Sequence, residues 1–158
     1  MARRPDARYA SRASETPATT PSPALVGDIV VGAPPRDGWV RSYLADGTLV
    51  QWRPPIDARP DVMRWAVDAE IGTQAVPRAL ADRTGVRQPE RFWPRWTAIE
   101  VTAKLLDVPI VMWLAEHGLS ARAAAGHGVV LRTVRRADLV ITVGGRLTPA
   151  AARAASAD

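Results

Sequence analysis

The chain has 158 residues, 47% of them hydrophobic, and a formal net charge of +5. This length suits a single domain with enough apolar residues for a core. The sequence contains no cysteine, which excludes disulfides and thiolate metal sites and is typical of a reducing, cytoplasmic protein. Only two histidines occur, so any bound metal is expected to be a hard cation with oxygen ligands.

Residues 1–24 are rich in Pro, Ser, Thr and Ala. We expect a disordered tail there, because little apolar surface is available to offset chain entropy. The tail has no continuous apolar stretch, so it does not resemble a secretory signal. The longest uncharged apolar run, VPIVMWLA at residues 108–115, is shorter than the about 20 residues of a membrane helix, so no membrane partner is expected.

Residues 25–60 predict one hairpin followed by a proline-rich linker. In WVRSYLADGTLVQW, residues 39–52, Asp46 and Gly47 suit a tight turn, and apolar residues flank the turn on both sides. The next segment, RPPIDARP at 53–60, contains three prolines, which lack the N–H that a strand ladder needs.

The main domain is expected over residues 61–148. MRWAVDAEIG, residues 63–72, predicts a short strand on which Asp68 and Glu70 share one face, because side chains alternate along a strand. A helix is predicted over residues 77–83, ending at a glycine. The main helix is predicted from about residue 97, after Pro94, to about residue 106.

Two apolar runs, residues 128–136 and 137–145, predict strands that pair antiparallel, and residues 149–158 are expected to form a loose C-terminus. The order of one strand, then helices, then strands indicates an α+β fold. We expect a small antiparallel sheet packed against one long helix.

Three carboxylates stand out within this domain. Asp68 and Glu70 converge on one side of the predicted strand, and Glu100 on the predicted helix could complete a trio of oxygen ligands. Such a trio repels itself unless a cation or protons lie between the carboxylates. Mg²⁺ fits, since it accepts a few carboxylates and also takes phosphate oxygens from a substrate. Lys104, the only lysine of the chain, is one helical turn beyond Glu100 and would be placed to hold such a phosphate.

Spacing alone leaves a purely structural interpretation open. Thr97 and Glu100 match a capping box, and Glu100 with Lys104 forms an i,i+4 pair worth about 0.3–0.5 kcal/mol. Asp68 and Glu70 could equally lie on the solvent face of an edge strand.

The same residues resemble two signatures of the 4′-phosphopantetheinyl transferase superfamily. WTAIEVTAK, residues 96–104, resembles W-[ST]-x-K-E-[AS]-x-x-K through Trp96, Thr97, Glu100 and Lys104. AVDAE, residues 66–70, resembles G-[IV]-D-x-E through Val67, Asp68 and Glu70. The two motifs occur in the family's order, and the resemblance covers roughly residues 63–145.

The resemblance implies a single half-lobe of that fold and an enzyme of the holo-acyl-carrier-protein synthase type. Such an enzyme transfers the 4′-phosphopantetheine arm of coenzyme A to a serine of an acyl or peptidyl carrier protein, in fatty acid or secondary metabolite biosynthesis. Asp68, Glu70 and Glu100 would hold Mg²⁺, and Lys104 would contact a coenzyme A phosphate. As catalytic residues, Glu100 would act as the base and Lys104 would stabilise the charge on the transferring phosphate.

Departures from the family pattern keep an alternative open. Ile99 stands where the second signature has lysine, and residues 25–60 offer a hairpin where two-lobed members have a whole half. Pairing with a second copy, as a homo-oligomer, could complete the cleft. The alternative is a degenerate, non-catalytic member of the fold that binds a carrier protein or another acidic partner. Nucleic acid is not expected as a partner, since no motif beyond charge supports it.

Overall fold

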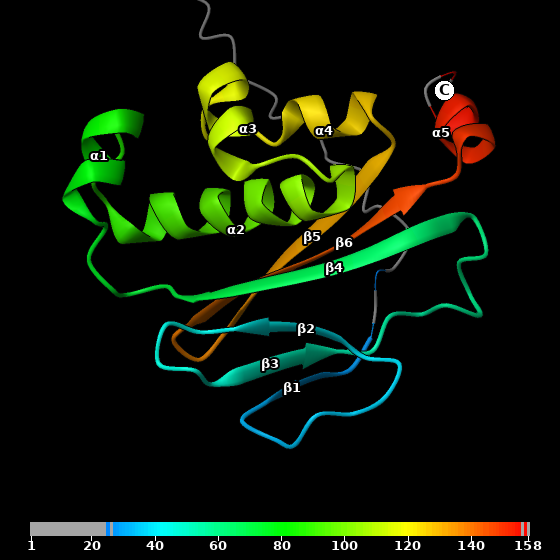
Figure 1. The fold of residues 1–158 in the computed structure, drawn as a ribbon, viewed down its shortest axis with the longest axis horizontal. Helices are drawn as coiled ribbons and strands as arrows, with labels where there is room; N and C mark the ends of the chain where they lie inside the picture. The colour runs from blue at the N-terminus through cyan, green and yellow to red at the C-terminus, as the bar shows by residue number, and fades with distance from the viewer. Residues whose placement is uncertain (1–24, 26, 156, 158) are drawn as a thin grey trace, which may run out of the picture.

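A three-stranded antiparallel sheet lies at the centre of the fold, with a long helix on one face and a second small sheet on the other (Figure 1). The structure is a computed structural model that describes residue 25, residues 27–155 and residue 157. The fold is α+β, as the sequence predicts. The expected disordered tail, residues 1–24, lies outside the described residues.

The central sheet contains β4 (Val62–Ile71), β5 (Val129–Arg136) and β6 (Leu139–Leu147), in the order β4-β6-β5. Both pairs are antiparallel. The strand predicted at 63–72 and the antiparallel pairing of the two late runs are therefore confirmed. Because β6 is in the middle, β4 is an edge strand, and its Asp68 lies opposite Thr142 of β6.

The second sheet consists of β1 (Ile29–Val31), β2 (Val40–Tyr43) and β3 (Leu49–Trp52), in the order β1-β3-β2. The predicted hairpin is confirmed as β2 and β3, and β1 adds a strand that the sequence did not predict. At the turn, Gly47 has a φ of 83°, a left-handed value that favours glycine. Asp46 Oδ1 accepts a 2.8 Å hydrogen bond from the Thr48 N–H.

Side-chain alternation along β4 divides the interior into two cores. Val67 and Ala69 point towards the second sheet and pack with Val50 and Trp52 of β3. Asp68, between them, points to the opposite face, where the helices lie. A hydrophobic core between two sheets thus occupies one side of β4, and a carboxylate is buried on the other.

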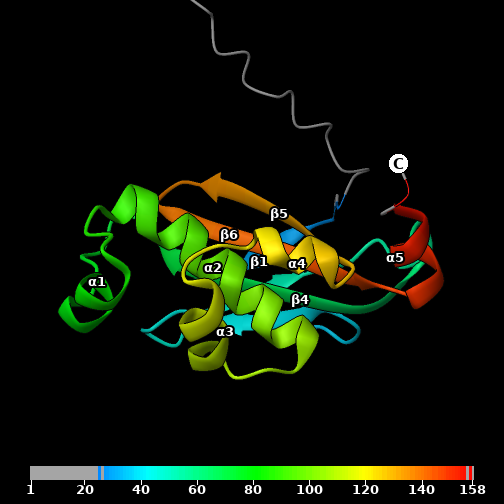
Figure 2. The same cartoon turned by 90° about the horizontal axis from the view of Figure 1, so that it is seen from above.

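In the described part of the chain, five helices accompany the sheets: α1 (Arg78–Thr84), α2 (Pro89–Leu106), α3 (Ile110–His117), α4 (Arg122–Gly126) and α5 (Pro149–Ala155). The prediction of a helix that ends at Gly85 is confirmed by α1. Helix α2 crosses the central sheet, and α3 and α4 cover its outer side (Figure 2). Pro149–Ala155 form α5 where the composition predicts a loose end.

The predicted start of the main helix near Thr97 is wrong, because α2 begins at Pro89 and passes through Pro94. Proline inside a helix removes the hydrogen bond to the carbonyl four residues earlier. Here that carbonyl belongs to Glu90, and the Arg135 guanidinium donates a 2.8 Å hydrogen bond to it. A substitute donor from β5 thus satisfies the acceptor that Pro94 leaves free.

The capping-box interpretation of Thr97 and Glu100 is also wrong. Thr97 lies two turns inside α2, and its hydroxyl donates to the Trp93 carbonyl at 3.1 Å. The same hydroxyl lies 2.7 Å from the Thr142 hydroxyl, which in turn lies 2.8 Å from that of Thr133. Thr97 therefore fixes α2 to the central sheet.

No helix among the described residues is both long and apolar enough to cross a membrane.

Candidate functional site

The ammonium group of Lys104 joins two acidic side chains from different elements. Its Nζ lies 2.7 Å from Asp68 Oδ1 on β4 and 3.6 Å from Glu100 Oε1, one turn earlier on α2. It also donates a 3.3 Å hydrogen bond to the Val67 carbonyl. The i,i+4 pair that the sequence predicts is therefore present, and it is one part of a larger group. We call Asp68, Glu70, Glu100 and Lys104 the acid–lysine cluster.

The cluster forms because α2 crosses the sheet next to its edge strand. Asp68 lies on the helix-facing side of β4, and the second sheet brings Ser42 of β2 to the same edge. The Ser42 hydroxyl donates a 3.0 Å hydrogen bond to Asp68 Oδ1. One carboxylate oxygen thus receives hydrogen bonds from two elements, β2 and α2.

The other oxygen of Asp68 has no such partner. Asp68 is only 4% exposed, and Oδ2 is buried without a hydrogen bond from any described residue. Burial raises the pKa of Asp68 to about 7; the charge of Glu100 adds to this effect, while Lys104 and Ser42 oppose it. The alternative in which Asp68 faces solvent on an edge strand is therefore wrong.

Glu70 lies at the margin of the cluster. Its Oε2 accepts a 2.9 Å hydrogen bond from Gln74 Nε2, in the segment that follows β4. Partial burial raises the pKa of Glu70, the hydrogen bond from Gln74 lowers it, and the Glu100 charge raises it further. The structure thus brings Lys104 into contact with both Asp68 and Glu100. Glu70 makes no ion pair with them, but the negative charge of Glu100 contributes to its raised pKa.

The donor chemistry of the cluster suits a hard cation, but its present arrangement is that of an ion pair. Three carboxylates are available, and Asp68 Oδ2 is a buried acceptor in need of a partner. Among the residues that the structure describes, however, no three acidic or histidine side chains are grouped so as to hold one metal ion. The Lys104 ammonium supplies the positive charge between Asp68 and Glu100. Mg²⁺ bound by all three carboxylates would therefore compete with this ammonium for the charges of Asp68 and Glu100.

Sequence reasoning missed two polar residues of the site, Ser42 and Gln74. Ser42 is within the predicted hairpin, and no local signal shows that this hairpin lies beside β4. Gln74 follows the strand in an irregular segment, where the spacing of residues does not show which way a side chain points. Ile99 stands where the signature that residues 96–104 resemble has a lysine, and it is fully buried against Trp113 and neighbouring apolar side chains. That position therefore holds core packing and no charge.

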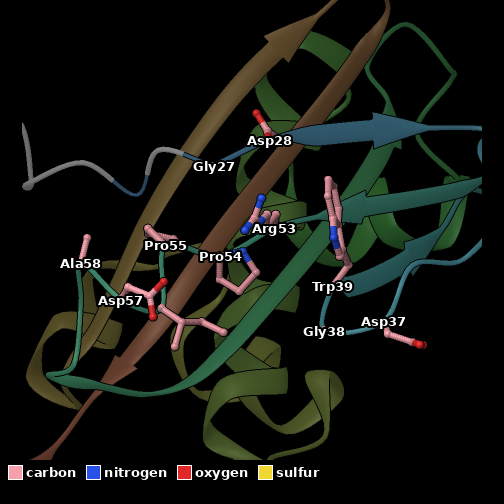
Figure 3. A pocket seen from close by; sticks show the side chains of 11 residues that line it. Gly27, Asp28, Asp37, Gly38, Trp39, Arg53, Pro54, Pro55, Asp57 and Ala58 are labelled. Carbon is pink, nitrogen blue, oxygen red and sulfur yellow. The ribbon is translucent and has the colours of Figure 1, made fainter.

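A separate hollow of about 680 Å³ lies at the end of the second sheet (Figure 3). Its lining includes Trp39, Arg53 and Asp57, together with the consecutive prolines Pro54 and Pro55. No member of the acid–lysine cluster lines this hollow. The two features are therefore distinct places on the molecule.

The Trp residues of α2 and α3 are structural anchors. Trp93 and Trp113 are each 4% exposed, and Trp93 Nε1 donates a 2.8 Å hydrogen bond to the Gln74 carbonyl. Phe92 stacks on Trp96 with ring centroids 5.6 Å apart. These contacts hold the first half of α2 and the segment after β4 together.

No family model, no curated protein and no solved structure matches the chain.

Proposed function

We propose that the chain is a 4′-phosphopantetheinyl transferase of the holo-acyl-carrier-protein synthase type, with the acid–lysine cluster as its active site. The observation that supports this proposal best is the contact between Lys104 Nζ and Asp68 Oδ1 at 2.7 Å. It joins the two signature-like motifs, which lie 36 residues apart at this pair. Residues that resemble the family's signatures separately are thus also neighbours in space.

The proposed reaction transfers one phosphoryl-linked arm. The serine oxygen of a carrier protein attacks the β-phosphorus of coenzyme A, and the bond from that phosphorus to the oxygen of 3′,5′-ADP breaks. Glu100, the most accessible acid in contact with Lys104, would accept the serine proton. The Lys104 ammonium, at 39% side-chain exposure, would turn from Asp68 towards the diphosphate and stabilise its negative charge.

Asp68, Glu70 and Glu100 would hold Mg²⁺ in this proposal. The ion, when bound, would supply further positive charge against the diphosphate. Asp68 has the orphan oxygen for such a bond, and the second sheet keeps its carboxylate in place through Ser42. Lys104 would then exchange one anionic partner, Asp68, for another, the substrate phosphate.

A mass-shift assay tests the proposal directly. The purified chain is incubated with apo carrier protein, coenzyme A and Mg²⁺, and the mass of the carrier protein is measured. We expect the added arm with the wild type, and loss of at least about 100-fold in rate with Glu100→Gln or Lys104→Ala, because each removes a group that acts on the reacting atoms. Glu116→Gln, an exposed acid on α3, is the matched control. Intact turnover in Glu100→Gln would exclude this mechanism.

A non-catalytic binding protein is the second candidate, and two observations favour it. Ile99 is fully buried where the family signature has a lysine, and the cluster is already neutralised in part by its own ammonium. This candidate predicts salt-sensitive binding of a carrier protein with no Mg²⁺-dependent binding of coenzyme A. Calorimetry with coenzyme A, with and without Mg²⁺, separates the two candidates.

A further inference from the structure

A cavity of about 410 Å³ lies between the end of α2, helix α3 and strand β6. We call it the α3 pocket. Its apolar wall contains Val108, Met112 and Trp113, and its polar side chains are Glu116, His117, His127 and Arg146. The volume is within the range of about 300–1,000 Å³ that is usual for small-molecule pockets. None of the acid–lysine cluster lines it, so the α3 pocket is a separate place from the proposed transferase site.

The apolar wall continues into an exposed hydrophobic patch. Val108, just before α3, is 37% exposed, and Val111 and Met112, in the first turn of α3, are 56% and 63% exposed. Scattered exposed apolar residues are normal, but a group beside a cavity indicates a surface that binds something. This patch would suit the hydrocarbon part of a ligand.

The lining of the pocket also includes an unpaired positive charge. Arg146 is half-buried on β6, and its guanidinium makes no hydrogen bond or ion pair with any described residue. Both histidines of the chain also line the pocket, and their rings lie 4.3 and 6.2 Å from that of Trp113, centroid to centroid. The single carboxylate of the lining, Glu116, is 77% exposed and lies 3.7 Å from His117. An anionic group in the pocket would therefore meet a cation that has no competing partner.

We propose that the α3 pocket binds a small amphipathic anion, with its charged head at Arg146 and its apolar chain along Val108 and Met112. A fatty carboxylate and an alkyl phosphate share this chemistry. Neutral or cationic molecules with the same chain would gain the apolar contacts but would lack the interaction with Arg146. The pocket therefore selects by charge as well as by hydrophobicity.

The test uses four eight-carbon probes: octanoate, octyl phosphate, octanol and octylammonium. Isothermal titration calorimetry measures their dissociation constants with the untagged chain. The two histidine Cε1–H resonances report on the site, because the chain has no other histidine and both line the pocket. We expect the two anions to bind at least about tenfold more tightly than octanol, octylammonium to bind most weakly, and both resonances to shift.

Two variants with matched controls complete the experiment. Arg146→Met should weaken octanoate binding about tenfold and leave octanol binding unchanged. Its control is Arg132→Met, an exposed arginine on β5 whose partner in β6, Val143, faces the second sheet. Met112→Asp should weaken the binding of both anions, octanoate and octyl phosphate. Met63→Asp, at a methionine of similar exposure on β4, should leave their binding unchanged.

The outcome decides between anion recognition and plain hydrophobic adsorption. Equal affinity for octanol and octanoate, unchanged octanoate binding by Arg146→Met, or histidine resonances that do not move at saturation would each overturn the proposal. A preference for octanoate over octyl phosphate, or the reverse, identifies which anionic head the pocket takes.

Discussion

The guanidinium of Arg135 on β5 donates a 2.8 Å hydrogen bond to the carbonyl of Glu90 on α2. Pro94 cannot donate a hydrogen bond to this carbonyl, since proline has no N–H. A β-strand thus completes a hydrogen bond of the helix, and α2 can begin at Pro89. The early start is important because it places Phe92 and Trp93 in the core, next to Val140.

We expect Arg135→Met to lower the free energy of unfolding by about 0.5–1.5 kcal/mol, the usual net contribution of one hydrogen bond. In a Pro94→Ala background the helix regains its own N–H donor, so the same substitution should have a smaller effect. Urea denaturation of the four chains gives the coupling energy between the two positions. Arg132→Met, at an exposed arginine on the face of β5 that is turned to the second sheet, is the control. Equal effects in both backgrounds would contradict this account.

The stability of the metal-free chain should fall as the pH rises from about 4 to about 7. Burial raises the pKa of Asp68 to about 7, whereas an Asp in an unfolded chain has a pKa of about 3.9. Between these two pH values Asp68 is protonated in the folded state and ionised in the unfolded state. The contribution of Asp68 to the free energy of unfolding is therefore fully present below pH 4 and is lost as the pH passes 7. Three pKa units set an upper limit of about 4 kcal/mol.

Chemical denaturation in EDTA at several pH values measures this dependence, and Asp68→Asn should flatten most of it. A small slope of the same sign should remain, because burial also raises the pKa of Glu70. Asp61, paired with Arg59 at 2.9 Å, has a lowered pKa and acts in the opposite direction, below about pH 4. A slope in Asp68→Asn as steep as that of the wild type would show that another group is responsible.

Close contact between α2 and β6 predicts a strong effect at Gly144. A Cβ atom added there would lie 2.7 Å from both Val101 Cγ1 and Leu131 Cδ2. Gly144→Ala should therefore destabilise the chain by about 1–3 kcal/mol through overpacking. Gly126→Ala is the control, since a Cβ atom at that position has no neighbour within 4 Å. Thermal unfolding of both variants tests the prediction, and equal melting temperatures would refute it.

The sequence predicts those parts of the fold that depend on local chemistry. The Asp46–Gly47 turn identifies the hairpin, and Gly85 marks the end of α1, because left-handed backbone at these positions favours glycine. The strand pattern at 63–72 also predicts correctly that Asp68 and Val67 face opposite sides. Each of these features is decided within a few residues.

Features that depend on distant partners could not be read in the same way. Pro94 indicates a helix boundary unless a donor such as Arg135, 45 residues from Glu90, is known to be near. For the same reason the sequence does not show that Ser42 reaches Asp68, or that Lys104 contacts Asp68 as well as Glu100. From the sequence we predict that Lys104 holds a substrate phosphate; in this structure its ammonium group contacts the carboxylates of Asp68 and Glu100.

Replacing Lys104 tests whether the ammonium takes the place of a metal ion. Lys104→Met leaves the carboxylates of Asp68 and Glu100 close together without a cation, so the variant should be less stable at pH 8, where repulsion and burial of charge act together. At pH 5 the loss should be smaller, because a protonated Asp68 needs no cation.

Millimolar Mg²⁺ should raise the melting temperature of this variant at pH 8 more than that of the wild type, because the ion no longer competes with the ammonium. The double variant Asp68→Asn, Lys104→Met should lose this gain. If Mg²⁺ shifts the wild type and Lys104→Met equally, the three carboxylates do not form a metal site, and the non-catalytic candidate is favoured.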